Sequence, residues 1–426
     1  MKIIKNITVL IILGMTLSFH GCNESNEKTE DALSRNLDQW LAKAVDKREP
    51  LESLEFAKEP LTKNRAAQVT ELLYADKQER LVKDYGSQWD NGSLSFGGYT
   101  MPFYYNIFGD QPSGGRSLFI SLHGGGGTTA EMNDQQYNNQ KHLYDAAMEN
   151  LEGVYLAPRA PTNTWDLWHQ DHIDELMNII IQMAVIKLNV NPDKVYLLGY
   201  SAGGDGVYQL APRMADRWAA ASMMAGHPND ASPLGLRNTP FALHVGALDD
   251  PYDRNRVAGQ WGEELDNLRF QDPQGYVHDV QIHEGMGHWM ELKDAVALAW
   301  MKNYRRNPIP EKVVWKQDNR HHKSFYWLGA PENKIKDGDK IVAEYNANLN
   351  EINILENSGD HVQLLINDDM LNLDEPVTIK YQGNVIAKKV FARSILNTYQ
   401  SMNHKGDPKL SFPCIISVIN NEEIQE

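Results

Sequence analysis

The pattern of apolar and polar positions divides the chain into three parts. In residues 31–85, apolar residues such as Leu33 and Leu37 recur every three or four positions, a spacing that predicts amphipathic helices. Pro50 and Pro60 interrupt this series, and proline breaks the interior of a helix. We therefore expect a helical extension made of several pieces and packed on the main domain.

From residue 92, short and almost wholly apolar runs alternate with stretches of helical periodicity. Such runs are typical of strands buried on both faces, so the alternation predicts an α/β domain with a mostly parallel sheet covered by helices. The expected strands are 93–97, 99–108, 116–122, 153–157, 195–199, 219–225, 240–246 and 276–283. The expected helices are 134–150, 171–188, 202–216, 254–270 and 291–304.

After segment 307–310, which contains two prolines, the helical periodicity mostly stops. Residues 313–419 hold short strand-like runs, and in one of them Val377 and Ile379 alternate with polar residues. This spacing predicts a separate β-sandwich after a linker. The expected division is 1–21 signal peptide, 22–91 tether and helical extension, 92–307 α/β domain and 311–426 β-sandwich.

The N-terminus predicts export. Lys2 and Lys5 precede an apolar run, 7–19, that is too short to span a bilayer as a helix. Gly21-Cys22-Asn23 follows and resembles a bacterial lipoprotein processing site. The resemblance implies lipidation of Cys22 and a membrane-anchored lipoprotein in the periplasm or on the cell surface. Ordinary signal-peptidase cleavage nearby is the other interpretation.

Composition excludes several classes of protein. The 426 residues are 42% hydrophobic and 23% charged, which is ordinary for a globular chain. The formal net charge of −16 repels phosphate backbones, so we expect no binding of nucleic acid. Two cysteines rule out a disulfide framework, and Cys414, in an apolar run, is expected to be a buried free thiol.

One motif predicts a catalytic nucleophile. Gly199-Tyr200-Ser201-Ala202-Gly203 lies directly after an apolar strand and before a helix, the context of a G-x-S-x-G nucleophile elbow. The turn lifts the Ser201 hydroxyl clear of the sheet, and the glycines leave room around it. The N–H of Ala202 starts the helix, where it can meet developing negative charge.

A glycine-rich loop predicts the rest of an oxyanion hole. His123 is followed by four glycines after the strand 116–122. Glycine lets the backbone come close to a substrate oxygen, and we expect Gly125 to supply the second donor, with Gly124 and Gly126 as the alternatives. A phosphate-binding loop is the competing interpretation, but no Gly-Lys-Ser/Thr follows.

An acid and a base follow the nucleophile in the chain. Asp249 comes after the strand 240–246, and His288 comes after the strand 276–283. The order Ser, Asp, His is that of the α/β-hydrolases. His288 would take the Ser201 proton and Asp249 would hold the imidazole. Asp250 and Asp253 are the alternative acids.

Other residues are weaker candidates. Trp165 and Trp168, in the loop after the strand 153–157, and His227, after the strand 219–225, should reach the same sheet edge and contact substrate. Core packing is the alternative for all three. His169 and His172 are three positions apart, but we expect neither a metal nor an organic cofactor.

Residues 96–305 resemble an α/β-hydrolase of the secreted esterase group related to polyhydroxyalkanoate depolymerases and feruloyl esterases. The matching motifs are the His-Gly loop, 195–204, Ala225-Gly226-His227-Pro228 and Gly287-His288-Trp289. The resemblance implies a serine esterase that acts, outside the cytoplasm, on an acyl ester of a glycan or polyester. A serine peptidase and a non-catalytic surface glycan-binding protein are the alternatives.

Replacing Cys22 tests the membrane anchor. Cys22→Ala should move the protein from the membrane fraction to the soluble exported fraction, because the acyl chains on Cys22 would supply the anchoring. Cell fractionation followed by immunoblotting measures the partition. Cys414→Ala is the matched control and should stay in the membrane fraction. An unchanged partition of Cys22→Ala would refute the lipid anchor.

Overall fold

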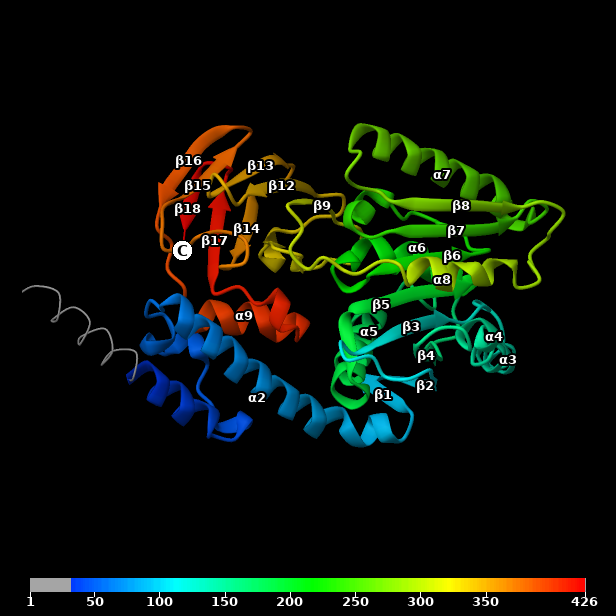
Figure 1. The fold of residues 1–426 in the computed structure, drawn as a ribbon, viewed down its shortest axis with the longest axis horizontal. Coiled ribbons are helices and arrows are strands. Elements are labelled where there is room, and N and C mark those ends of the chain that lie inside the picture. The colour runs from blue at the N-terminus through cyan, green and yellow to red at the C-terminus, as the bar shows by residue number, and fades with distance from the viewer. Residues whose placement is uncertain (1–31, 426) are drawn as a thin grey trace, which may run out of the picture.

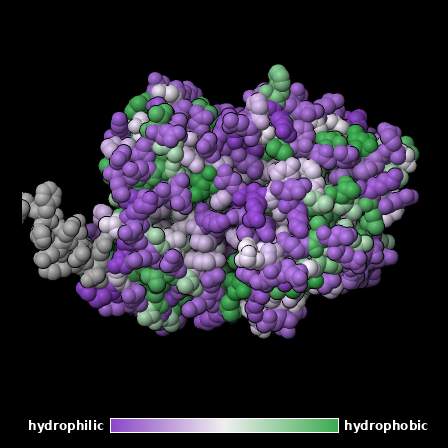
Figure 2. All heavy atoms as spheres, in the orientation of Figure 1, coloured by the Kyte–Doolittle hydropathy of each residue, from purple (hydrophilic) through white to green (hydrophobic). Residues whose placement is uncertain are grey.

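A computed structural model describes residues 32–425 of the protein (Figure 1). The predicted signal peptide and the lipidation site Cys22 lie outside the described residues. Within residues 32–425, no helix is both long enough and apolar enough to cross a bilayer. The face of the molecule seen in Figure 2 is mostly hydrophilic, with hydrophobic residues in small separate patches.

An eight-stranded sheet has the order β1-β2-β4-β3-β5-β6-β7-β8. Strands β3 to β8 are parallel, whereas β2 is antiparallel to both β1 and β4. This is the strand order of the α/β-hydrolase fold, so the predicted fold class is confirmed. The strands are β1 (Ser93–Phe96), β2 (Tyr99–Phe108), β3 (Arg116–Leu122), β4 (Gly153–Pro158), β5 (Val190–Tyr200), β6 (Ala220–Met224), β7 (Phe241–Gly246) and β8 (His278–His283).

Helices cover both faces of this sheet because its strands are apolar on both sides. In β3, Leu118 and Ile120 belong to the core formed with α5, α6 and α7, whereas Phe119 belongs to the core formed with α4 and α8. The helices are α3 (Ala130–Gln140), α4 (Asp145–Met148), α5 (Asp171–Leu188), α6 (Ala202–Arg213), α7 (Arg254–Gln271) and α8 (Val296–Met301).

Two predicted helices have different bounds in the structure. The expected helix 134–150 is two pieces, α3 and α4, and α3 begins earlier because the Thr129 side chain caps it by accepting the Met132 N–H. The expected helix 291–304 is reduced to α8 and a short 3₁₀ turn, Lys293–Ala295.

The N-terminal extension consists of a helix at 32–41, three short 3₁₀ turns and the long helix α2 (Lys63–Asp90). Thr62 caps α2 by accepting the Arg65 N–H, and α2 runs five residues beyond its expected end. One end of the extension packs against α9 (Ile395–Lys405), while the other end of α2 lies against β1 and α5 (Figure 1).

The C-terminal part holds two five-stranded sheets around one apolar core, as the predicted β-sandwich requires. The helix α9 was not expected from the sequence; it interrupts the strands between the capping residues Ser394 and Gly406. One sheet has the order β10-β11-β14-β17-β18 and the other β16-β15-β13-β12-β9. The strands are β9 (Lys312–Lys316), β10 (Ser324–Phe325), β11 (Leu328–Gly329), β12 (Lys340–Asn346), β13 (Glu351–Asn357), β14 (His361–Ile366), β15 (Val377–Tyr381), β16 (Asn384–Lys389), β17 (Cys414–Ile419) and β18 (Glu423–Gln425).

Buried charges join the sandwich to the α/β sheet. Arg306 donates to Asp407 and to Asp193, and the Arg217 guanidinium lies 3.9 Å from the same Asp407 carboxylate. Burial would raise the pKa of Asp407, but Arg306 and Arg217 hold it below its ordinary value. The domain boundary between the α/β domain and the β-sandwich, expected near residues 307–311, stays a prediction.

Neutralising Asp407 tests this buried cluster. Asp407→Asn should lower the free energy of unfolding by about 3–5 kcal/mol, because it removes the charge opposite two buried guanidinium groups. Chemical denaturation at pH 7 measures the change. Glu375→Gln, at an exposed carboxylate of the sandwich, is the control and should change the stability by less than about 0.5 kcal/mol. An equally small effect of Asp407→Asn would contradict the role of the cluster.

Candidate active site

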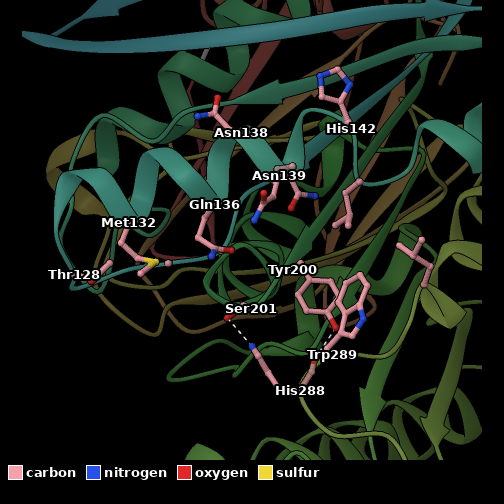
Figure 3. A pocket seen from close by; sticks show the side chains of 15 residues that line it. Thr128, Met132, Gln136, Asn138, Asn139, His142, Tyr200, Ser201, His288 and Trp289 are labelled. Atoms are coloured by element: carbon pink, nitrogen blue, oxygen red, sulfur yellow. Dashed lines mark hydrogen bonds between the residues drawn. The ribbon is translucent and has the colours of Figure 1, made fainter.

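Three side chains predicted to act together lie in one hydrogen-bonded row. His288 Nε2 is 3.0 Å from Ser201 Oγ, and His288 Nδ1 is 2.8 Å from Asp249 Oδ2. Ser201 follows β5, Asp249 follows β7 and His288 follows β8, so the row lies at the carboxyl edge of the parallel strands. Figure 3 shows the Ser201–His288 contact.

The turn at Ser201 is strained and closely packed. Ser201 has φ 58° and ψ −122°, a conformation that L-residues rarely adopt. A Cβ on Gly199 would lie 2.3 Å from the carbonyl oxygen of Gly203, and a Cβ on Gly203 would lie 2.1 Å from that of Leu122. Only glycine fits at these two positions, which explains the spacing of the motif.

Tyr200 connects the turn at Ser201 to the loop that carries His288. Its hydroxyl donates to the backbone carbonyl of His288 at 2.6 Å and accepts the Met290 N–H at 3.1 Å. The residue next to Ser201 thus fixes the backbone of His288. Sequence reasoning missed this role, because the variable position of a G-x-S-x-G motif gives no sign of where its side chain points.

Of the three candidate acids, only Asp249 reaches His288. Asp249 is fully buried, and its second oxygen lies 3.6 Å from Arg254 Nη1. Asp250 accepts a hydrogen bond from Asn255, and Asp253 pairs with Arg256. Both alternatives therefore point to other partners.

The glycine loop is fixed by a residue that the sequence did not reveal. Gly125 and Gly126 have φ near +110°, and buried Asn133 accepts the Gly126 N–H and donates to the Gly126 carbonyl. The Gly126 N–H is thereby occupied. Gly124 and Gly125 lie in the wall of the cavity that contains Ser201, while Ala202 begins α6, where backbone N–H groups have no helical acceptor.

His123 supports the same loop from beneath. The Ala160 N–H donates to His123 Nε2 at 3.1 Å, so Nδ1 carries the proton and donates to the Gly124 carbonyl at 2.6 Å. Burial lowers the pKa of His123 to about 4, so the ring is neutral at pH 7. A neutral imidazole can make both hydrogen bonds, whereas an imidazolium cannot accept.

Ser201 and His288 line a cavity of about 900 Å³, which we call the main cavity. Met132, Gln136 and Asn139 extend toward it from α3, and Trp289 lies on the opposite wall next to His288 (Figure 3). The wall combines amide groups with apolar side chains, a mixture typical of small-molecule sites.

The three residues predicted to contact substrate, Trp165, Trp168 and His227, differ in whether they line a cavity. Trp165 is 63% exposed and lines a second, smaller cavity with His227. The prediction for Trp168 is corrected, because its side chain is fully buried and its indole donates to the His123 carbonyl at 2.9 Å. Trp168 packs beneath the glycine loop and cannot touch a ligand.

His169 and His172 do not form a metal site with their neighbours. His169 is buried, while the His172 ring stacks on Tyr99 with the centroids 3.6 Å apart. In the part of the chain between residues 32 and 425, no group of three or more His, Cys, Asp or Glu side chains is arranged to hold a metal ion.

The titration of His123 should make the protein less stable in acid. Its folded pKa of about 4 lies below the ordinary value of 6.5, so between these values the unfolded chain binds a proton that the folded chain does not. Stability is therefore lost as the pH falls, by about 2 kcal/mol between pH 7 and pH 5 for this residue. Urea denaturation at both pH values should show a smaller loss in His123→Phe. An equal loss in both proteins would rule out this contribution.

No protein-family model matches the chain. It is 30% identical, over 129 residues, to the protein named "Putative esterase NocK" from Nocardia uniformis subsp. tsuyamanensis, covering 28% of this chain and 37% of that protein. It is 28% identical, over 145 residues, to the bifunctional acetylxylan esterase/xylanase XynS20E from Neocallimastix patriciarum, covering 33% of this chain and 20% of that protein. The match thus spans well under half the length of either relative.

Solved structures of esterases resemble about half of the chain. A thermostable esterase has 16% sequence identity and a TM-score of 0.38, over 51% of this chain and 64% of that one. An acetyl xylan esterase from Aspergillus awamori has 12% identity and a TM-score of 0.36, over 47% of this chain and 93% of that one. The strand order of this chain gives it the α/β-hydrolase fold, and the proteins that it resembles are esterases.

Proposed function

We propose that this protein is a serine carboxylic-ester hydrolase with Ser201, His288 and Asp249 as its catalytic triad. The observation that carries the proposal is the hydrogen-bonded row Asp249–His288–Ser201 beneath the glycine loop. A serine hydroxyl is a weak nucleophile by itself. An adjacent base that is oriented by a third group activates it.

The reaction proceeds by acyl transfer in two steps. Ser201 Oγ attacks the ester carbonyl carbon while its proton passes to His288 Nε2. The tetrahedral intermediate collapses, the bond to the alcohol oxygen breaks, and His288 returns the proton to the leaving alcohol. A water molecule, deprotonated by His288, then attacks the acyl-enzyme. The bond between the acyl carbon and Ser201 Oγ breaks, His288 returns the proton to that oxygen, and the carboxylic acid is released. No cofactor is needed.

The backbone stabilises the charge that develops during both steps. The N–H groups of Ala202 and Gly125 would bind the oxyanion, each contributing roughly 3 kcal/mol. Gly124 is the alternative donor in the loop, whereas the Gly126 N–H is engaged by Asn133. Asp249 holds the Nδ1–H tautomer of His288 and stabilises the imidazolium.

The proposed substrate is an acyl ester of a glycan or polyester, met outside the cytoplasm. The name of the relative from Neocallimastix patriciarum, an acetylxylan esterase/xylanase, supports a glycan ester. The signal peptide and the lipidation of Cys22, both predicted from the sequence, support the proposal of an exported, membrane-anchored enzyme. The same triad could cleave an amide, so the activity test includes one.

Substitutions in the triad test the mechanism. Ser201→Ala should remove turnover of p-nitrophenyl acetate by several orders of magnitude, and labelling by a fluorophosphonate should disappear. Asp249→Asn should lower kcat by about 10⁴-fold, because Asn holds the wrong imidazole tautomer. Asp250→Asn, at the neighbouring exposed carboxylate, is the matched control and should lose little.

The outcomes separate the candidate functions. Turnover of acyl esters with little turnover of aminoacyl amides supports the esterase, and the reverse supports a peptidase. A folded wild-type protein that turns over neither and resists the fluorophosphonate would contradict catalysis and favour a glycan-binding protein.

A further inference from the structure

A second cavity also borders the glycine loop. We call it the Asp205 cavity, and its side-chain wall is formed by Trp165, Asp205, His227, Asn229, Tyr252 and Arg254. Its volume of about 340 Å³ is within the range of small-molecule sites. It shares Gly125 with the main cavity, but neither Ser201 nor His288 lines it.

The stereochemistry of the reaction decides which part of an ester each cavity takes. The leaving oxygen must lie near His288 Nε2, which lines the main cavity together with Ser201. The carbonyl oxygen must face the N–H groups of Gly125 and Ala202. The remaining substituent of the carbonyl carbon is the acyl group, which must point away from His288. The Asp205 cavity borders Gly125 and Ala202 but is not lined by His288, so it is the cavity available to an acyl group that points away from His288.

This cavity offers a hydrogen-bond acceptor beside a donor. Asp205 Oδ1 accepts the backbone N–H of His227 at 2.6 Å, which leaves Oδ2 for a ligand. The Asn229 N–H donates to His227 Nδ1 at 2.9 Å, so His227 carries its proton on Nε2 and can donate it. Burial lowers the pKa of His227 and raises that of Asp205 to about 6.

The charges around this cavity do not favour an ionic ligand. The Arg254 guanidinium lies 3.6 Å from Asp249 and stacks over Tyr252, and it also stabilises the charge of Asp205. Arg254, the one cation that residues 32–425 place in this wall, is thus shared between two carboxylates. A neutral ligand with hydroxyl groups would use the polar atoms without adding a charge.

Two exposed aromatic rings complete the wall. Trp165 is 63% exposed and Tyr252 is 76% exposed, although burying such rings is favourable. Flat rings next to hydrogen-bonding groups suit a ligand with apolar C–H faces and polar edges, which is the character of a sugar ring.

We propose that the Asp205 cavity binds a hydroxylated acyl group of about one sugar ring, so that the substrate is an ester of a sugar acid. This inference rests on the proposed esterase function and deepens it. Asp205 and His227 would bind neighbouring hydroxyl groups of the acyl ring, Trp165 would pack against its face, and the alcohol would leave through the main cavity.

A pair of esters with the same leaving group tests the proposal. Methyl D-glucuronate and methyl cyclohexanecarboxylate both release methanol and both carry a six-membered ring, but only the first carries hydroxyl groups. The wild-type protein should have a kcat/KM at least about tenfold higher for the sugar-acid ester, because an unpaired Asp205 and His227 disfavour the apolar ring.

Two variants then test whether the preference for the sugar-acid ester arises in the Asp205 cavity. His227→Ala, at a side chain that is not fully buried, should reduce the ratio of the two kcat/KM values by about fivefold or more. Trp289→Ala, at an exposed aromatic residue of the main cavity, is the matched control and should leave the ratio unchanged. A ratio that falls equally in both variants would contradict the assigned cavity.

The remaining outcomes separate this inference from the proposed function. Equal or better turnover of the cyclohexane ester, or turnover of p-nitrophenyl acetate with neither methyl ester cleaved, would overturn the inference and leave the esterase in place. Failure of the wild-type protein with every ester and with the fluorophosphonate would overturn both.

Discussion

Close approach of backbone segments at the Ser201 turn is the constraint on which the candidate site depends. The carbonyl oxygen of Leu122, at the end of β3, would lie 2.1 Å from any Cβ at position 203, and that of Met224, at the end of β6, would lie 2.6 Å from one at position 204. The carboxyl ends of β3, β5 and β6 therefore meet at the start of α6. This contact sets the positions of the glycine loop after β3 and of Ser201 together, so the proposed oxyanion donors and the proposed nucleophile share one rigid support.

Much of this arrangement could be predicted, because each element carries its chemistry in a local motif. The elbow glycines have a steric reason, and the positions of Asp249 and His288 after strands follow from parallel topology. Tyr200, Asn133 and His123 support the site through contacts between distant segments, which local patterns do not encode. The orientation of Trp168 was unpredictable for the same reason. The sequence places an aromatic ring in the loop but does not tell that the ring is buried.

The fold was predictable to a similar degree. Apolar runs revealed the strands of the central sheet, because strands buried on both faces need no polar partner. The helix α9 was not predicted, since its stability comes from Ile395 and Met402 packing against an extension more than 300 residues earlier in the chain. Propensity contributes little to such a helix, and tertiary contacts decide it.

The packing of the N-terminal extension on α9 also has a consequence for folding during synthesis. Leu73 and Ile395 belong to the same apolar cluster but are 322 positions apart in the chain. At about 5–20 residues per second, a ribosome needs roughly 15–65 s to make the second after the first. Throughout this time the apolar face of the extension lacks its partner, so it stays exposed to wrong association until α9 has been made.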